Sequence, residues 1–411
     1  MANLWWGDGS KLIVGIVGKP NTGKSTFFNA ATLLDVPVAN YPFTTVSPNF
    51  GVGSVRVKCV CRDLDVDDNP VNSVCIEGSR FIPVKLVDIA GLVPGASEGR
   101  GLGNKFLDEI RQADALIHVI DASGSTDEEG KVAEIGSHDP LVDIPFVENE
   151  FDIWLLSIVK KDWGKISRGT EGNLERFVDA MADRLSGLSI RKSQILSALD
   201  NADLKGDKSL YWGDDDLKKF CTLLRTVSKP SLIAANKADL PNVRAGVDGL
   251  RVMGRKFVPT AAEAELLLRR ASAKNLIHYL PGDDVFNVLN KKSLSEQQSK
   301  ALKFVREMVL NVWGSTGVQE AINSVFFDLL QSIVVYPVED ESKYSNRKGN
   351  ILPDAYLVRD GSTARDLAYK VHTDLGAGFL YALNARSGKR LASDYILQDG
   401  DVIKIISTGK R

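Results

Sequence analysis

The chain has 411 residues, of which 44% are hydrophobic and 25% charged, and its formal net charge is −2. This length predicts two or three domains, and the near-neutral charge excludes a general basic coat for nucleic acid while leaving room for local patches. No apolar stretch approaches the ~20 residues of a membrane helix, and residues 1–10 lack the pattern of a signal peptide. We therefore expect a globular protein of the cytoplasm that contacts no membrane.

Apolar runs in the first part of the chain alternate with helix-like segments. A strand at 11–17 precedes a glycine-containing loop and a helix over about 25–34. Short polar motifs follow several apolar runs, which is typical of a parallel α/β sheet whose ligands bind at the carboxyl ends of the strands. Further strands are expected at 51–61 and 81–91, and the segments 115–123 and 231–239 are apolar runs that end in polar loops.

The four cysteines, Cys59, Cys61, Cys75 and Cys221, are too few for a disulfide framework. The first three raise the alternative of a zinc site, but Cys59 and Cys61 are separated by one residue and no histidine lies near them in the sequence. We expect reduced thiols buried in strands, without disulfides.

The middle of the chain has helical spacing and almost no strand signal, so we predict a helical, coiled-coil-like insertion over residues 146–228. It divides an α/β domain into residues 1–145 and 229–331. A composition change near Tyr336 opens a strand-rich module, and residues 332–411 are expected to form a small β-grasp domain. The charged residues of the insertion are interpreted as a solvated helix surface, with a partner-binding arm as the alternative.

Residues 18–25 read GKPNTGKS, which matches the phosphate-binding pattern G-x-x-x-x-G-K-[ST] between a predicted strand and a predicted helix. The glycines let backbone N–H groups point at phosphates, Lys24 can reach the β- and γ-phosphates, and the Ser25 hydroxyl can bind Mg²⁺. The positive end of the following helix attracts the same anion. Lys24 is also assigned a catalytic role, and the predicted nucleotide-binding residues here are Gly18, Lys19, Pro20, Asn21, Thr22, Gly23, Lys24, Ser25 and Thr26.

Asp88 and Gly91 end the predicted strand 81–91 in the pattern D-x-x-G. An aspartate at this point can hold Mg²⁺ through water, and the Gly91 N–H can bind the γ-phosphate and so contribute to catalysis. The connection 40–48 contains Thr44 and Thr45, and either hydroxyl can close over the metal only when a γ-phosphate is present. The order of this loop is then expected to follow the nucleotide state.

The segment 231–239 ends in the motif N-K-x-D, which consists of Asn236, Lys237, one further residue and Asp239. The Asp239 carboxylate can accept hydrogen bonds from the ring N–H and the exocyclic amine of guanine, a donor pair that adenine lacks. The Lys237 stem can cover the base, and Asn236 can tie this loop to the phosphate loop. The motif therefore predicts a guanine-reading loop.

The backbone that faces the other edge of the base must follow a strand. Residues 255–263, RKFVPTAAE, supply such a strand, so the base-backing residues are predicted to be Thr260, Ala261 and Ala262. Ser272 begins a similar short word, Ser-Ala-Lys, but it stands at the end of a helical run and is rejected.

With these motifs in place, the chain resembles the YchF branch of the Obg family, a group of translation-factor-class P-loop GTPases. The resemblance rests on NYPFTT, on the long stretch DIAGLVPGASEGRGLGN and on a C-terminal module similar to a TGS domain. It implies a GTPase sheet with helices on both faces, Mg²⁺ and GTP as ligands, and Thr45 as the metal-facing threonine. It also implies ribosome or RNA contact through the helical insertion and the TGS module. We expect a monomer.

Two positions bear on hydrolysis. Leu92 follows the D-x-x-G word where Ras-like enzymes carry a water-orienting Gln, and because leucine cannot orient water we expect slow hydrolysis. The resemblance also suggests that Asn21 holds a K⁺ ion that acts in place of an arginine finger. Equal rates of hydrolysis in K⁺ and Na⁺ buffers would exclude this role.

The resemblance includes one departure. Bacterial and eukaryotic YchF relatives carry Glu in place of the last Asp of the base word and favour ATP, whereas this chain has Asp239, as archaeal-type members do. We therefore predict a preference for GTP, and a change in loops 40–48 and 91–105 on hydrolysis. Two alternatives stay open, namely an ATPase like those relatives and a nucleotide-gated ribosome-binding module whose turnover is incidental.

Overall fold

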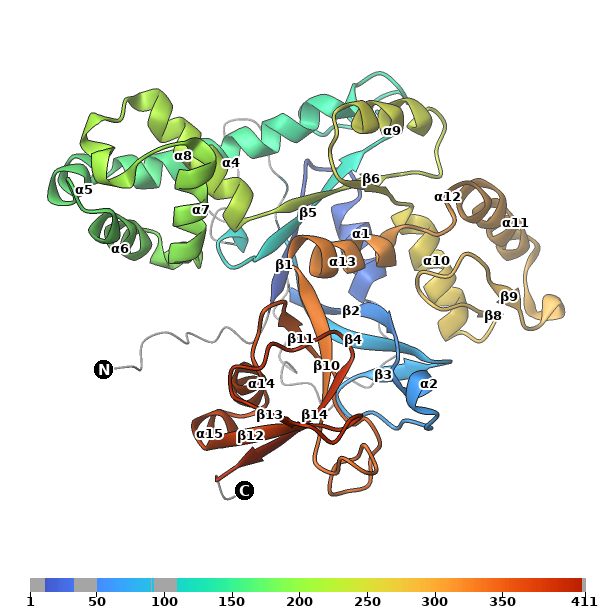
Figure 1. Ribbon diagram of the computed structural model, residues 1–411. Helices are drawn as coiled ribbons and strands as arrows, with labels where there is room; N and C mark the ends of the chain where they lie inside the picture. Colours follow the sequence, from blue (N-terminus) through green and yellow to red (C-terminus); the bar gives the residue numbers. More distant parts are fainter. Residues whose placement is uncertain (1–11, 33–49, 90, 92–108, 409–411) are drawn as a thin grey trace.

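The computed structural model of the protein describes residues 12–32, 50–89, 91 and 109–408. Figure 1 shows a central sheet between helices, a group of helices that extends to one side, and a smaller sheet formed by the C-terminal part of the chain. The predicted fold class is thereby confirmed: an α/β sheet with helices on both faces, a helical insertion and a C-terminal β-grasp domain.

Some sequence predictions concern residues outside the described ranges. These are the loop 40–48 with Thr44 and Thr45, and Leu92 with the rest of 92–105. Within the described ranges, no helix is both long and apolar enough to span a membrane.

In the described part of the chain, seven strands form the central sheet: β1 (Ile13–Val17), β2 (Phe50–Lys58), β3 (Val74–Ile76), β4 (Ser79–Asp88), β5 (Ala115–Asp121), β6 (Ser231–Asn236) and β7 (Phe257–Pro259). Their order is β2-β4-β1-β5-β6-β7, with β3 paired to β4. β4, β1, β5, β6 and β7 run parallel, whereas β2 and β3 run antiparallel to β4. Every residue of β5 is buried, as expected for a central parallel strand covered on both faces.

The strand registers bring polar residues to one edge of this sheet. Ile16 of β1 pairs with Asp88 of β4, and Asp121 of β5 pairs with Asn236 of β6. Because carboxyl ends of parallel strands meet at the same edge, Asp88, Asp121 and Asn236 lie where β1 leads into residues 18–23. The topology therefore assembles a ligand site at this edge.

Helices cover both faces of the central sheet: α1 (Lys24–Thr32), α4 (Asp143–Lys160), α9 (Val243–Val252), α10 (Ala262–Ala273) and α13 (Val318–Ser324). Two more helices, α11 (Glu296–Val305) and α12 (Asn311–Trp313), lie between α10 and α13 in the chain. On one face, α1, α10 and α13 contribute Phe27, Leu266 and Ile322 to a continuous core with the strands. On the other face, α4 buries Phe151 and Leu155 in a second core. A small hairpin of β8 (Ile277–His278) and β9 (Asn287–Val288) lies near α10.

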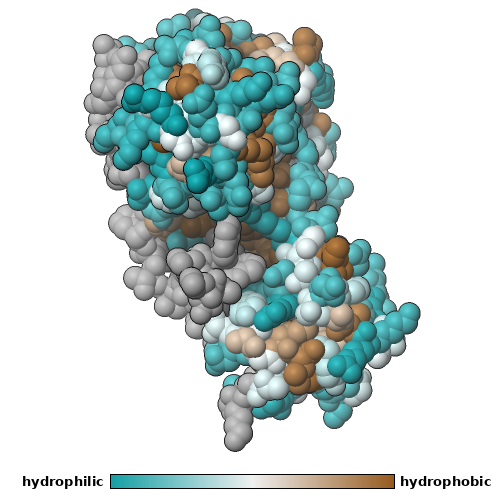
Figure 2. All heavy atoms as spheres, turned by 60° about the vertical axis from the view of Figure 1, so that its left-hand side comes forward, coloured by the Kyte–Doolittle hydropathy of each residue, from teal (hydrophilic) through white to brown (hydrophobic). Residues whose placement is uncertain are grey.

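The helical insertion packs around an aromatic cluster. Trp163 stacks on Trp212 with ring centroids 5.4 Å apart, and Phe177 and Phe220 contact Trp212 at 5.5 and 5.4 Å. Its surface in Figure 2 is mostly hydrophilic, with single hydrophobic side chains between polar ones. The helices that follow α4 here are α5 (Trp163–Gly169), α6 (Leu174–Arg184), α7 (Lys192–Ala202) and α8 (Asp214–Ser228).

The C-terminal sheet contains β10 (Ser332–Val338), β11 (Tyr356–Arg359), β12 (Phe379–Asn384), β13 (Arg390–Leu391) and β14 (Asp401–Ser407), and it carries α14 (Ala364–Val371) and α15 (Thr373–Ala377). Its strand order is β11-β10-β14-β12-β13, with β10 and β14 parallel. Thr363 and Asp366 form a capping box at the start of α14.

Two strand predictions are too long, because the predicted strand 81–91 ends at Asp88 in β4 and the predicted strand 51–61 ends at Lys58 in β2. The expected strand 51–61 ends early because the chain turns into the short helix α2 (Cys61–Leu64), whose hydrogen bonds replace the ladder to β4. Cys59 therefore lies between β2 and α2, and Cys75 lies in β3. The expectation that the four thiols lie in strands is wrong for Cys59, Cys61 and Cys221, the last of which lies in α8.

Candidate nucleotide-binding site

The phosphate loop, residues 18–23, connects β1 to α1 and closes on itself. The Thr22 hydroxyl and the Lys24 ammonium both donate to the carbonyl of Lys19, at 3.0 and 2.6 Å. Lys24 is the first residue of α1, and burial lowers its pKa to about 8, against the attraction of Asp88. A phosphate group placed at this loop would supply the negative charge that this buried ammonium lacks.

Two glycines of this loop are required by geometry. Gly18 and Gly23 have φ angles of 147° and 95°, which favour glycine. A Cβ atom at Gly23 would lie 2.2 Å from Nδ2 of Asn236, and one at Gly18 would lie 2.2 Å from the carbonyl oxygen of Val119. A side chain at Gly18 would collide with the backbone of Val119, and one at Gly23 would collide with the side-chain amide of Asn236.

The predicted metal and γ-phosphate residues lie beside Lys24. The Ser25 hydroxyl donates to Asp88 Oδ2 at 2.9 Å, and burial raises the pKa of Asp88 while the Ser25 bond and the Lys24 charge oppose that change. A Cβ atom at Gly91 would lie 3.2 Å from Lys24 Nζ, so Gly91 is adjacent to the ammonium. The structure brings Lys24, Ser25, Asp88 and Gly91 together, and Thr26 follows in the first turn of α1.

The buried side chain of Asn236 joins the phosphate loop to the base end of the site. Its Nδ2 donates to the carbonyl of Thr22 at 2.9 Å. Its Oδ1 accepts from the Ala262 N–H at 3.2 Å and from the Thr260 hydroxyl at 3.3 Å. A single amide thus fixes three segments that are far apart in the sequence.

The motif of residues 236–239, which is predicted to read guanine, forms a tight loop after β6. Lys237 has a φ of 63°, and its ammonium donates to Asp121 Oδ2 at 2.8 Å and to the Ser125 hydroxyl at 3.0 Å. The Ala238 N–H donates to the carbonyl of Thr260 at 3.0 Å, which holds this loop against the base-backing segment. Asp239 is half-buried, and burial raises the pKa of its carboxyl group.

The base-backing segment lies beside this loop, and the rejected alternative does not. Thr260, Ala261 and Ala262 are buried at the junction of β7 and α10, where the Ala261 N–H donates to the carbonyl of Thr316 at 2.8 Å. Ser272 lies in the last turn of α10, and its hydroxyl donates to the Tyr279 carbonyl at 3.4 Å.

The sequence did not reveal a second support of the phosphate loop. Lys19 is 1% exposed, and its ammonium lies 2.7 Å from Asp143 Oδ1 and donates to the carbonyl of Asp127 at 2.6 Å. Asp143 also contacts His138 Nε2 at 2.8 Å. Asn21 donates to the Gly130 carbonyl at 2.9 Å. The only signal for this brace is that its residues follow the carboxyl end of a predicted strand.

Comparison with known proteins decides the family. Residues 13–149 match the family described as 50S ribosome-binding GTPase, residues 234–340 match the G4 motif-containing domain of the Obg-like GTPase YGR210-like, and residues 347–407 match the TGS domain. The chain is 48% identical over 400 residues to an uncharacterized GTP-binding protein of Methanocaldococcus jannaschii, which covers 97% of this chain and 100% of that protein. It belongs to the YchF/Obg-like GTPase family.

Other members are similar over nearly their whole length. The ribosome-binding ATPase YchF of Mycoplasma genitalium is 34% identical over 413 residues, which cover 95% of this chain and 98% of that protein. The crystal structure of a GTP-binding protein from Pyrococcus horikoshii covers 97% of this chain and 100% of that chain, at 41% identity and a TM-score of 0.75. The family resemblance inferred from the sequence is confirmed, and the chain is a P-loop nucleotide hydrolase by family.

Replacing Asn236 tests the bridge between the two ends of the site. Asn236→Ala leaves the Thr22 carbonyl and the Ala262 N–H without this buried partner, and each loss costs about 1–3 kcal/mol. We expect affinity for guanine nucleotides to fall about 10- to 100-fold in titrations with a fluorescent analogue, for di- and triphosphates alike. Asn201→Ala, on the exposed surface of α7, is the matched control. Unchanged affinity in Asn236→Ala would contradict the bridge.

Proposed function

We propose that this YchF/Obg-like protein is a Mg²⁺-dependent GTPase that hydrolyses GTP slowly and acts as a nucleotide-controlled switch. The observation that carries the proposal is the Asn236 side chain, which hydrogen-bonds the phosphate loop at Thr22 and the base-backing segment at Ala262. A site for free phosphate or pyrophosphate has no need of this bridge. The ligand that uses both ends is a nucleoside triphosphate.

The proposed base reader is Asp239. Burial raises its pKa, which means that the surroundings disfavour its charge, and two N–H donors from a bound base would offset that cost. Guanine presents such a pair at its ring N–H and its amine, whereas adenine presents an acceptor at the ring position. The proposal is therefore GTP over ATP. The alternative, an ATPase, is supported by the Mycoplasma genitalium relative, which is named a ribosome-binding ATPase.

The phosphate end is proposed to work with a Mg²⁺ ion. Ser25 and Asp88 supply neighbouring oxygen donors, the ligand type that Mg²⁺ prefers, and would hold the ion with Thr45 from the loop 40–48. The ion, when bound, neutralises charge on the β- and γ-phosphates. Lys24 and Gly91 lie side by side and would donate to the γ-phosphate.

Two further parts of the proposal concern the rate and the switch. Leu92 stands where other GTPases carry a water-orienting Gln, so GTP hydrolysis is slow without a partner. In the proposed potassium site, the side-chain amide oxygen of Asn21 would bind the K⁺ ion. Loops 40–48 and 91–105 would change their order when the γ-phosphate leaves.

The partner is proposed to be the ribosome or its RNA, as in the relative named a ribosome-binding ATPase. The docking parts would be the helical insertion, 146–228, and the C-terminal module, 332–411. Asp143, which pairs with Lys19 at 2.7 Å, is the first residue of α4, and this helix continues into the insertion, so the phosphate loop contacts the element that carries the insertion. The remaining segments, 1–145 and 229–331, form the proposed GTPase domain of a cytoplasmic monomer.

Single-turnover hydrolysis of GTP with and without ribosomes tests the switch. We expect ribosomes to raise the rate, because partners of other switch GTPases supply the missing catalytic group and raise rates about 10³–10⁵-fold. Lys24→Ala is the control for contaminating hydrolysis, since it removes the phosphate-facing ammonium. The absence of stimulation would favour a binding module whose nucleotide is an effector with incidental turnover.

Asp239→Asn tests the base assignment. It replaces one acceptor by an amide donor, so GTP affinity should fall on the order of 100-fold, while xanthosine triphosphate, which has a carbonyl in place of the guanine amine, should bind better than GTP. Competition titrations measure both changes. Asp248→Asn is the matched control, because Asp248 lies exposed on α9. Equal loss for all nucleotides in Asp239→Asn would count against base reading.

A further inference from the structure

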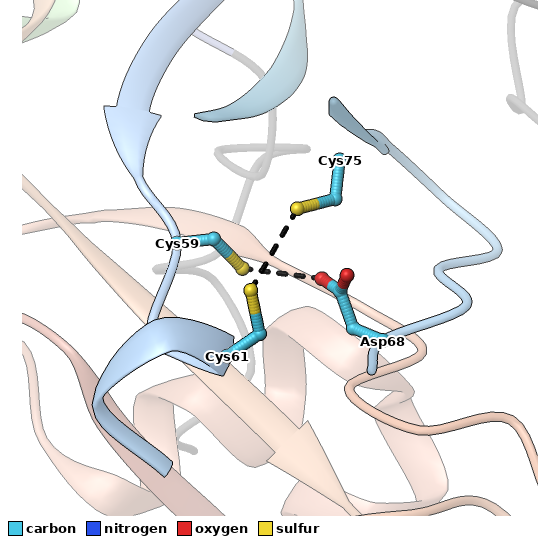
Figure 3. Close-up of side chains that lie close together, drawn as sticks. All are labelled: Cys59, Cys61, Asp68 and Cys75. Atoms are coloured by element: carbon cyan, nitrogen blue, oxygen red, sulfur yellow. Dashed lines mark hydrogen bonds between the residues drawn. The ribbon is translucent and has the colours of Figure 1, made fainter. Parts of the chain in front are cut away.

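Three cysteines and one aspartate converge at the turn between β2 and β3 (Figure 3). Cys59 follows β2, Cys61 begins α2, Cys75 lies in β3, and Asp68 comes from the connection between α2 and β3. The three sulfur atoms and one carboxylate oxygen all lie within 4.8 Å of one another. Cys59 and Cys61 are buried, and the other two are partly buried.

The separations match those of a small tetrahedral site. Cys61 Sγ and Cys75 Sγ are 3.8 Å apart, and Cys59 Sγ donates to Asp68 Oδ2 at 3.2 Å. Two sulfurs bound to one zinc ion at about 2.3 Å in a tetrahedron are about 3.8 Å apart. The four groups therefore need only small movements to surround one ion.

We propose that Cys59, Cys61, Cys75 and Asp68 bind one Zn²⁺ ion in a structural site. Thiolates with one carboxylate are a donor set that zinc accepts, and four protein ligands leave no position open for water or substrate. Four anionic ligands around Zn²⁺ leave a net charge of −2. The fully buried Arg80 offsets part of it, because its Nη1 lies 2.7 Å from Asp68 Oδ2 and orients that carboxylate.

A disulfide is the competing use of these thiols. The 3.8 Å between Cys61 and Cys75 is far longer than an S–S bond of about 2.05 Å. A disulfide would also use only two of the three thiols, and it would not explain why Asp68 lies beside them. The convergence of all four groups is the observation that favours a metal ion.

The proposed ion would stabilise the contact between the central sheet and the C-terminal module. The connection that carries Asp68 docks on that module: the Val71 N–H donates to the Pro353 carbonyl at 2.6 Å, and the Ala355 N–H donates to Asn72 Oδ1 at 3.0 Å. Arg80, which holds Asp68, also donates to the carbonyl of Leu352 at 2.5 Å. Zinc would thus fix the loop that positions the C-terminal module.

Metal analysis of the full-length protein tests the site. After chelator treatment under reducing conditions and reconstitution with Zn²⁺, we expect one ion per chain. The same is expected of the control Cys221→Ser, whose thiol is buried in α8. Cys59→Ser, Cys75→Ser and Asp68→Asn should each weaken zinc binding at least about 10-fold in competition with a chromogenic chelator.

Cobalt provides a readout that does not depend on the folding of variants. Co²⁺ bound to the wild-type protein in this site should give the intense visible bands of tetrahedral coordination and a thiolate charge-transfer band, which Zn²⁺ then removes. Three results would overturn the proposal. They are less than one zinc ion per chain in the reconstituted wild type, unchanged zinc binding in Cys59→Ser, and a Cys61–Cys75 disulfide that persists in protein purified and kept under reducing agent.

Discussion

The nucleotide site depends on one buried amide. Asn236 closes β6, and its hydrogen bonds to Thr22 and Ala262 hold the phosphate loop, the base-reading loop and the start of α10 in one arrangement. Parallel strands make this arrangement possible, because they deliver the loops after β1, β4 and β6 to the same edge of the sheet. Gly23 is part of the same constraint, since any side chain there would collide with the Asn236 amide.

The phosphate loop is also held from its other side, and this second support links the site to the rest of the molecule. The ion pair of Lys19 with Asp143 is almost fully buried, and breaking such a pair by removing one partner typically costs about 3–5 kcal/mol. Asp143 is the first residue of α4, which opens the helical insertion. A shift of the phosphate loop therefore bears directly on the element that carries the insertion, so the nucleotide site and the proposed docking surface share a contact.

How much the sequence predicts depends on whether the relevant residues are neighbours in the chain. Lys24 and Ser25 belong to one short motif at a strand–helix junction, and Asp239 stands just after an apolar run. The local sequence pattern is therefore sufficient to predict that these residues lie at the site. The contact between Lys19 and His138, which supports the phosphate loop, joins residues 119 positions apart, and no local sequence pattern predicts it. The sequence raises Cys59, Cys61 and Cys75 as an alternative zinc site but does not favour it, because no fourth ligand is evident. Asp68 follows no ligand pattern in the sequence, and the turn after β2 that brings Cys61 toward it is predicted to be strand.

The central claim is that the ligand is GTP, chosen by Asp239 in a loop fixed by Asn236. The most direct measurement is the affinity of the wild-type protein for GTP and ATP, determined by competition against one fluorescent guanine nucleotide in Mg²⁺ buffer. The account predicts GTP binding on the order of 100-fold tighter than ATP binding, because adenine leaves the half-buried carboxylate without its two donors. Comparable affinities for the two nucleotides would contradict it.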